Sequence, residues 1–121
     1  MRDPLPIYEL LVVSAWADGI VKPEEVLAVQ RIVAADEALS RIGNRSEIAR
    51  AVKDRITAKG IDAVLREIAP AIAPEDRELA FRLCAKVVNA DGEMAGEDAD
   101  VLGTLQELFG LPAAAVTRLI R

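Results

Sequence analysis

Hydrophobic residues recur along this chain at the spacing of an α-helix, without the alternation expected of a half-buried strand. Near the start, Ile7, Leu10, Leu11 and Ser14 fall on one stripe, and the same period returns in later segments. Asp-Gly pairs, single glycines and prolines interrupt the pattern at short intervals. This punctuation predicts about seven helices. The first four cover residues 6–17, residue 23 up to a loop at 40–44, 46–57 and 61–69, and the last three cover residue 74 up to Asp91-Gly92, 97–109 and 112 onwards.

Residues suited to helix starts mark several of these boundaries. Pro23 fits the first turn of a helix because its missing N–H group is not needed there. Ser46 is the expected N-cap of the third helix, Asp62 that of the fourth, and Pro74 opens the fifth. The second helix is expected to turn one apolar stripe inward, made of Val26, Val29, Ile32 and Val33.

Length and composition predict a single all-α domain covering residues 1–121. A chain of 121 residues can bury one hydrophobic core but is short for two domains. Hydrophobic residues make up 52% of the chain, as in a globular protein, whereas aromatic residues make up 3%, which argues against a β-sandwich. Short helices with frequent loops favour a compact orthogonal bundle over long parallel rods.

The composition also excludes several kinds of chemistry. The chain has no histidine, which removes Ser-His-Asp triads, Cys-His pairs and His-ligated zinc or haem. Cys84 is the single cysteine, so it forms no disulfide within the chain, and we expect it to be a buried small hydrophobe. No signal peptide is recognised and no apolar stretch reaches ~18 residues, so we expect a cytoplasmic protein without membrane insertion.

Charge is distributed unevenly along the chain. The net charge of −5 disfavours nucleic acid as a partner. Between Lys86 and Arg118 every charged residue is acidic, whereas basic residues dominate from Arg41 to Lys59. These regions are either two solvated helix faces or, in the second interpretation, an acidic site for a cation or a basic partner.

Two segments match without gaps at an offset of 73 residues. The aligned pairs are Ala17-Asp18-Gly19 with Ala90-Asp91-Gly92, Glu24 with Glu97, and Glu25 with Asp98. Each unit consists of a helix, an Asp-Gly turn, a short connector and an acidic helix start. The match predicts an internal duplication, with two related helical hairpins around a shared core.

The Asp-Gly turns allow a structural and a functional interpretation. Glycine ends a helix at no steric cost, and acids favour the start of the next helix. Asp18 and Asp91, however, follow helix C-termini, where a carboxylate costs ~0.3–1 kcal/mol. The N–H groups of the following helix, a basic side chain such as Lys22 in the first unit, or a bound divalent cation (Ca²⁺, Mg²⁺ or Mn²⁺) would offset this cost. The candidate ligands are Asp18, Glu24, Glu25, Asp91, Glu93, Glu97 and Asp98.

The spacing of each unit resembles part of an EF-hand loop, with Asp, Gly and then an acid seven residues after the Asp. The leading Asp of that loop is missing from both units, where Ser14 and Val87 stand instead. A self-contained calcium loop is therefore not expected. A weaker site completed by carboxylates of both units remains the metal hypothesis.

The two Ala-Asp-Gly turns, each followed by an acidic helix start, resemble the TerB-like family of tellurite resistance proteins. The second motif continues in the same way from Leu105 to Pro112. The resemblance implies a compact bacterial helical domain with an internal duplication and acids that hold metal ions. It also implies relatives beside DnaJ-type co-chaperones and in membrane-linked stress complexes. Gly96 and Lys22 depart from the motifs, and Lys22 places a positive charge among the first acids.

Three functions follow from these observations. The first is a non-catalytic accessory domain in stress response, whose acidic pocket binds a divalent cation or a basic protein partner. The second is a structural interaction module or homodimer without a metal site, using its basic or alanine-rich surfaces. The third, an enzyme with paired carboxylates, lacks a nucleophile beside a base. We therefore predict that the protein is not an enzyme.

Overall fold

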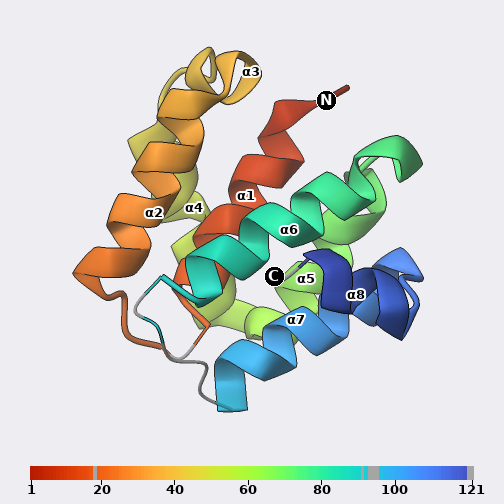
Figure 1. The fold of residues 1–121 in the computed structure, drawn as a ribbon. Coiled ribbons are helices and arrows are strands. Elements are labelled where there is room, and N and C mark those ends of the chain that lie inside the picture. Colours follow the sequence, from red (N-terminus) through yellow and green to blue (C-terminus); the bar gives the residue numbers. More distant parts are fainter. Residues whose placement is uncertain (18, 91, 93–95, 120–121) are drawn as a thin grey trace.

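The computed structural model describes residues 1–17, 19–90, 92 and 96–119, with the side chains of 96–98 left aside. These residues form eight α-helices and two single-turn 3₁₀ helices, and no strand. The α-helices are α1 (Pro4–Ala15), α2 (Pro23–Ala35), α3 (Glu37–Ser40), α4 (Arg45–Lys59), α5 (Ile61–Ile68), α6 (Arg77–Val88), α7 (Gly96–Phe109) and α8 (Ala113–Leu119), and the 3₁₀ helices are η1 (Ala69–Ala71) and η2 (Pro74–Asp76). The predicted all-α bundle is confirmed, and its short helices cross one another (Figure 1).

Helix α1 is the central element of the bundle. It contacts α2, α3, α4, α5 and α6, and its most extensive contact is with α6. A helix surrounded in this way must be apolar on nearly every side, which its sequence PLPIYELLVVSA provides. Its polar Ser14 is buried, and the Ser14 hydroxyl donates a hydrogen bond to the carbonyl of Leu10 at 2.8 Å. The predicted stripe of Ile7, Leu10, Leu11 and Ser14 is therefore confirmed.

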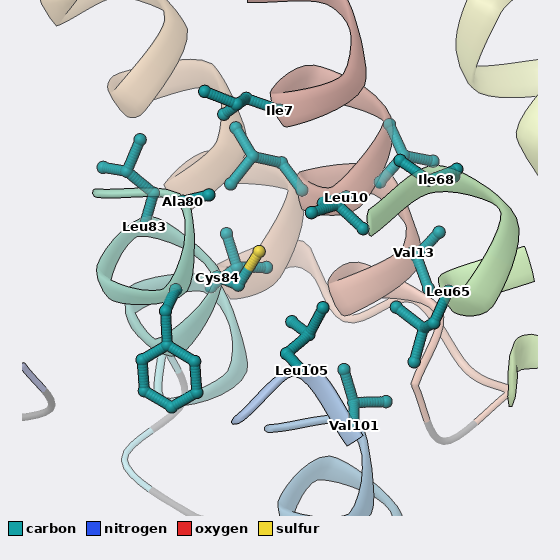
Figure 2. Packing of buried hydrophobic residues seen from close by; sticks show 14 of the residues in the cluster. Ile7, Leu10, Val13, Leu65, Ile68, Ala80, Leu83, Cys84, Val101 and Leu105 are labelled. Carbon is teal, nitrogen blue, oxygen red and sulfur yellow. The ribbon is translucent and has the colours of Figure 1, made fainter. Parts of the chain in front are cut away.

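The contact between α1 and α6 forms the middle of the hydrophobic core. Figure 2 shows Leu10 with Leu83 and Cys84 of α6 on one side and Ile68 of α5 on the other, while Leu105 of α7 closes the cluster. Burial raises the pKa of the Cys84 thiol to about 12. Cys84 is thus the buried small hydrophobe that the sequence predicted.

The sequence predicted one helix from residue 23 to the loop at 40–44, whereas the structure divides this stretch into α2 and the short helix α3. Helix α3 forms because Asp36 acts as its N-cap, with the Asp36 carboxylate accepting a hydrogen bond from the N–H of Leu39 at 3.0 Å. Leu39 is fully buried and anchors this single turn to the core. A four-residue helix is too short to show a hydrophobic period, so packing decides its presence.

The predicted caps of α4 and α5 are wrong. Asn44, not Ser46, is the N-cap of α4, in a left-handed conformation with φ of 56° that asparagine tolerates. Gly60 takes the N-cap of α5, and Asp62 instead accepts a hydrogen bond from Arg66 one turn later at 2.8 Å. The fifth predicted helix also begins differently, because Pro74 starts the 3₁₀ turn η2 that precedes α6. Within the described residues, no helix is long and apolar enough to span a membrane.

The central position of α1 predicts a large effect of truncating its buried face. Leu10→Ala removes a fully buried side chain and should lower the free energy of unfolding by about 2–5 kcal/mol. Leu5→Ala, in the same helix but 40% exposed, should lower it by less than ~1 kcal/mol. Urea denaturation followed by circular dichroism measures both values. Equal losses for the two variants would contradict the central role of α1.

Candidate functional site

The described residues on either side of Asp18 and Asp91 have nearly identical backbone conformations in the two units. Helix α1 ends at Trp16 with φ of −97° and ψ of 9°, and α6 ends at Asn89 with φ of −91° and ψ of 7°. Gly19 and Gly92 both take a left-handed conformation, with φ of 80° and 79°. The N–H of Gly19 donates to the carbonyl of Trp16 at 2.9 Å, and the N–H of Gly92 donates to that of Asn89 at 2.9 Å. The turns are thus matched structures, while the internal duplication as a whole stays a prediction.

Most of the predicted metal ligands lie outside the described part of the chain. Glu24 and Glu25 are described with their side chains. The others are Asp18, Asp91 and Glu93, which are not described, and Glu97 and Asp98, whose side chains are not described. Within the described residues, no group of three or more acidic or cysteine side chains is placed to hold a metal ion.

The neighbouring acids Glu24 and Glu25 have different environments, although the sequence treats them alike. The Glu25 side chain is 2% exposed, and its carboxylate accepts a hydrogen bond from the N–H of Lys22 at 3.1 Å. This bond closes the first turn of α2 as one half of a capping box. Glu24 is exposed and lies at one end of a groove between α2 and α6. Glu25 therefore stabilises the helix start, while Glu24 faces solvent.

Each Ala-Asp-Gly turn lies beside the helix start of the other unit. Ala90, from the second turn, lines the same groove as Glu24 at the start of α2. Ala17, from the first turn, lines a smaller hollow together with Asp100 and Val101 near the start of α7. This arrangement arises because α1 and α6 pack together and finish at the same end of the molecule (Figure 1). The two units are therefore neighbours at this end.

The two turns differ in the basic side chains near them. Helix α1 has no basic residue in its last turn, but the Nζ atom of Lys53 from α4 lies 5.2 Å from the ring centroid of Trp16, its C-cap. Helix α6 has Lys86 in its own last turn. A positive charge near a helix C-terminus is favourable because the helix dipole is negative there. Both helix ends are thus partly compensated, by residues from different elements.

The basic segment from Arg41 to Lys59 is not a continuous free positive surface. Arg55 pairs with Glu9 at 3.3 Å and with Glu67 at 2.9 Å, and Lys59 pairs with Glu67 at 2.8 Å. The hydrogen bonds from Lys59 and Arg55 lower the pKa of the Glu67 carboxyl. Arg41 pairs with Glu37. Three of the six basic residues of this segment are thus paired with carboxylates, which weakens its interpretation as the basic surface of an interaction module.

The groove between α2 and α6 was missed at the sequence level. Its volume is about 550 Å³, and its lining includes Leu27 and Arg31 from α2 and Leu83 from α6. The predicted inward stripe of α2 is partly wrong, because Val26 is 40% exposed, whereas Val33 is buried as expected. The one signal for the groove was the presence of apolar residues around the whole circumference of α2.

The comparisons with known proteins agree with the fold. The family model described as Tellurite resistance protein TerB matches residues 6–120 of this chain. The match covers both Asp-Gly pairs and every described helix, except for the first two residues of α1. Neither the curated proteins nor the solved structures contain a match.

Gly92→Ala and Gly103→Ala should have opposite effects on the free energy of unfolding, because Gly92 takes a left-handed conformation and Gly103 lies inside α7. An added Cβ at Gly92 or at Gly103 meets no atom within 4 Å, so only the backbone conformation distinguishes them. Gly92→Ala should lower the free energy of unfolding by about 1–2 kcal/mol because its φ is positive. Gly103→Ala, inside α7, should raise it by about 0.5–1 kcal/mol. Thermal and urea unfolding provide the comparison, and a stabilising Gly92→Ala would refute the turn geometry.

Proposed function

Because the chain belongs to the TerB family of tellurite resistance proteins, we propose that it is a non-catalytic accessory domain that binds a divalent cation in the response to metal-oxyanion stress. The single observation that carries this proposal is the placement of each Ala-Asp-Gly turn beside the helix start of the other unit. Acids of both motifs belong to these segments. Their mutual repulsion is the reason for a cation at this end.

The chemistry of the donor set favours a hard cation. Every candidate ligand is a carboxylate and the chain has no histidine, so Ca²⁺, Mg²⁺ or Mn²⁺ fits better than a softer metal. In this proposal the ligands come from the set Asp18, Glu24, Asp91, Glu93, Glu97 and Asp98, and Glu25 holds the first turn of α2 in position. The bound ion would supply positive charge between carboxylates that follow or precede helix ends.

The second motif is the better candidate for the larger share of ligands. It contains Asp91, Glu93, Glu97 and Asp98 without a local base, whereas the first contains Lys22. Lys53 from α4 adds a second positive charge near the first turn, over the Trp16 ring. The first motif thus has Lys22 and Lys53 near it, whereas the described base near the second is Lys86 in the last turn of α6, so a cation at the second motif would add to the compensation that Lys86 gives.

The same features support a role without catalysis. Cys84 is the one thiol of the chain, and its burial and raised pKa remove it as a nucleophile. The absence of histidine removes the usual general base. We infer that the bound cation orders a surface that binds a protein partner in the cytoplasm. That partner would belong to the membrane-linked stress complexes that the resemblance implies.

Isothermal titration calorimetry with CaCl₂, MgCl₂ and MnCl₂ tests this proposal. We expect one of the three cations to bind with a Kd of about 10⁻⁴–10⁻³ M, as in weak calcium sites. Asp91→Asn should weaken that binding at least ~tenfold because it removes a charged ligand. The matched control is Glu47→Gln, which removes an exposed acid on α4 and should leave the affinity unchanged.

The absence of binding heat for all three cations would reject the cation site. Light scattering on the same samples then decides the alternative, because a structural module that dimerises would show twice the monomer mass with or without cation. Equal weakening by Asp91→Asn and Glu47→Gln would show that the cation responds to overall charge and not to a site.

A further inference from the structure

The groove between α2 and α6 has an apolar floor that the rest of the described chain leaves accessible. Both helices contribute to this floor, with Leu27, Ala28 and Ile32 from α2 and Leu79 and Leu83 from α6. Leu27, which lines the groove, is 43% exposed, and Val26 and Ile20, which lie close to it in the sequence but do not line the groove, are 40% and 66% exposed. Three of the five large exposed hydrophobic residues in the described chain are thus on α2 or just before it. Such a concentration of exposed apolar surface marks a binding surface.

Three basic side chains border this floor from both sides. Arg31 extends from α2, and Arg82 and Lys86 extend from α6, one turn apart. None of the three takes part in a hydrogen bond or ion pair within the described residues. Five other arginines of the described chain are paired with carboxylates, namely Arg2, Arg41, Arg55, Arg66 and Arg118. The rim of the groove therefore carries positive charge that no acid in the described part of the chain pairs with.

The two described acids of the groove lining, Asp36 and Glu24, lie at its ends and offset only part of this charge. Asp36 lies at one end, and its carboxylate already accepts the capping hydrogen bond from Leu39. Glu24 lies at the other end, beside Ala90. The middle of the groove is thus apolar at its floor and positive along both edges.

We propose that this groove binds an amphipathic helix of a partner protein, with an apolar stripe flanked by acidic residues. Apolar side chains spaced at i, i+3, i+4 and i+7 would pack between α2 and α6. Glutamates or aspartates beside that stripe would reach Arg31 on one edge and Arg82 and Lys86 on the other. A docked helix of about 12 residues would be ~18 Å long, comparable with α2 and α6 themselves.

A second copy of this chain fits the groove less well than an acidic helix. Two facing copies would bring their sets of Arg31, Arg82 and Lys86 together, and among the described lining residues each copy would offer only the carboxylates of Glu24 and Asp36 at the groove ends in return. Like charges at an interface cost free energy. The proposal does not depend on the cation site, since it rests on different residues.

The test uses two synthetic helical peptides and the full chain in a buffer with EDTA, so that cations play no part. Both peptides carry leucines at i, i+3, i+4 and i+7, flanked by glutamates in one and by lysines in the other. We expect the glutamate peptide to bind at least ~tenfold more tightly, with affinity falling as salt is added. In ¹H–¹⁵N spectra the shifted signals should include Leu27, Ile32 and Leu83.

Variants of exposed residues assign the binding to the groove. The double variant Arg82→Glu, Lys86→Glu should lose at least ~tenfold in affinity for the glutamate peptide and gain affinity for the lysine peptide. Leu27→Gln should weaken the glutamate peptide about fivefold. Arg50→Glu, an exposed arginine on α4, is the matched control and should leave both affinities almost unchanged.

Three outcomes would overturn the proposal. One is equal binding of the two peptides, and another is a set of shifted signals that excludes the groove. The third is tighter binding of sodium laurate than of the glutamate peptide at the same residues, which would assign the groove to an acyl carboxylate. Circular dichroism melting curves of each variant establish that it is folded.

Discussion

The packing of α1 against α6 is the constraint on which the rest of this structure depends. Both helices are buried along most of their contact, and burial of each large apolar side chain contributes ~1.5–3 kcal/mol. The two helices also finish at the same end of the bundle, so the segments that follow them begin at that end. The packing of Leu10 with Leu83 and Cys84 thus helps to bring the C-terminal ends of α1 and α6 to the same end of the bundle. The candidate site is a consequence of core packing and not of local sequence alone.

Local sequence was sufficient where one residue type has one strong preference. The positive φ of Gly19 and Gly92 followed from the Asp-Gly pairs, and Pro23 begins α2 as predicted. Local sequence was insufficient where contacts between distant parts of the chain decide where a helix begins or which of its faces is buried. Helix α4 begins at Arg45 and not after Ser46. In the loop before this helix, the Arg45 guanidinium donates hydrogen bonds to the carbonyls of Ser40 and Ile42, at 2.9 Å each. The partial exposure of α2 likewise depends on which helices surround it, and no period in its sequence records that.

The candidate site shows the same division between local and long-range information. Glu24 and Glu25 are adjacent acids, so the sequence suggested two equivalent ligands. Adjacent residues on a helix point about 100° apart, and here one carboxylate closes the helix start while the other borders the groove. Glu24 belongs both to the proposed cation ligands and to the lining of the basic groove. Apart from this residue, the two proposed binding surfaces are independent, so either can be wrong without the other.

The central claim is that the acidic motifs of both units form one neighbourhood at one end of the bundle. Paramagnetic broadening of ¹H–¹⁵N signals by substoichiometric Mn²⁺ tests it most directly, because the effect falls steeply with distance from the ion. The account predicts that the amide signals of Gly19 and Gly92 broaden together, while that of Leu39 in α3, at the opposite end of the bundle, stays sharp. Broadening of one turn alone, or of acidic surfaces throughout the molecule, would contradict it.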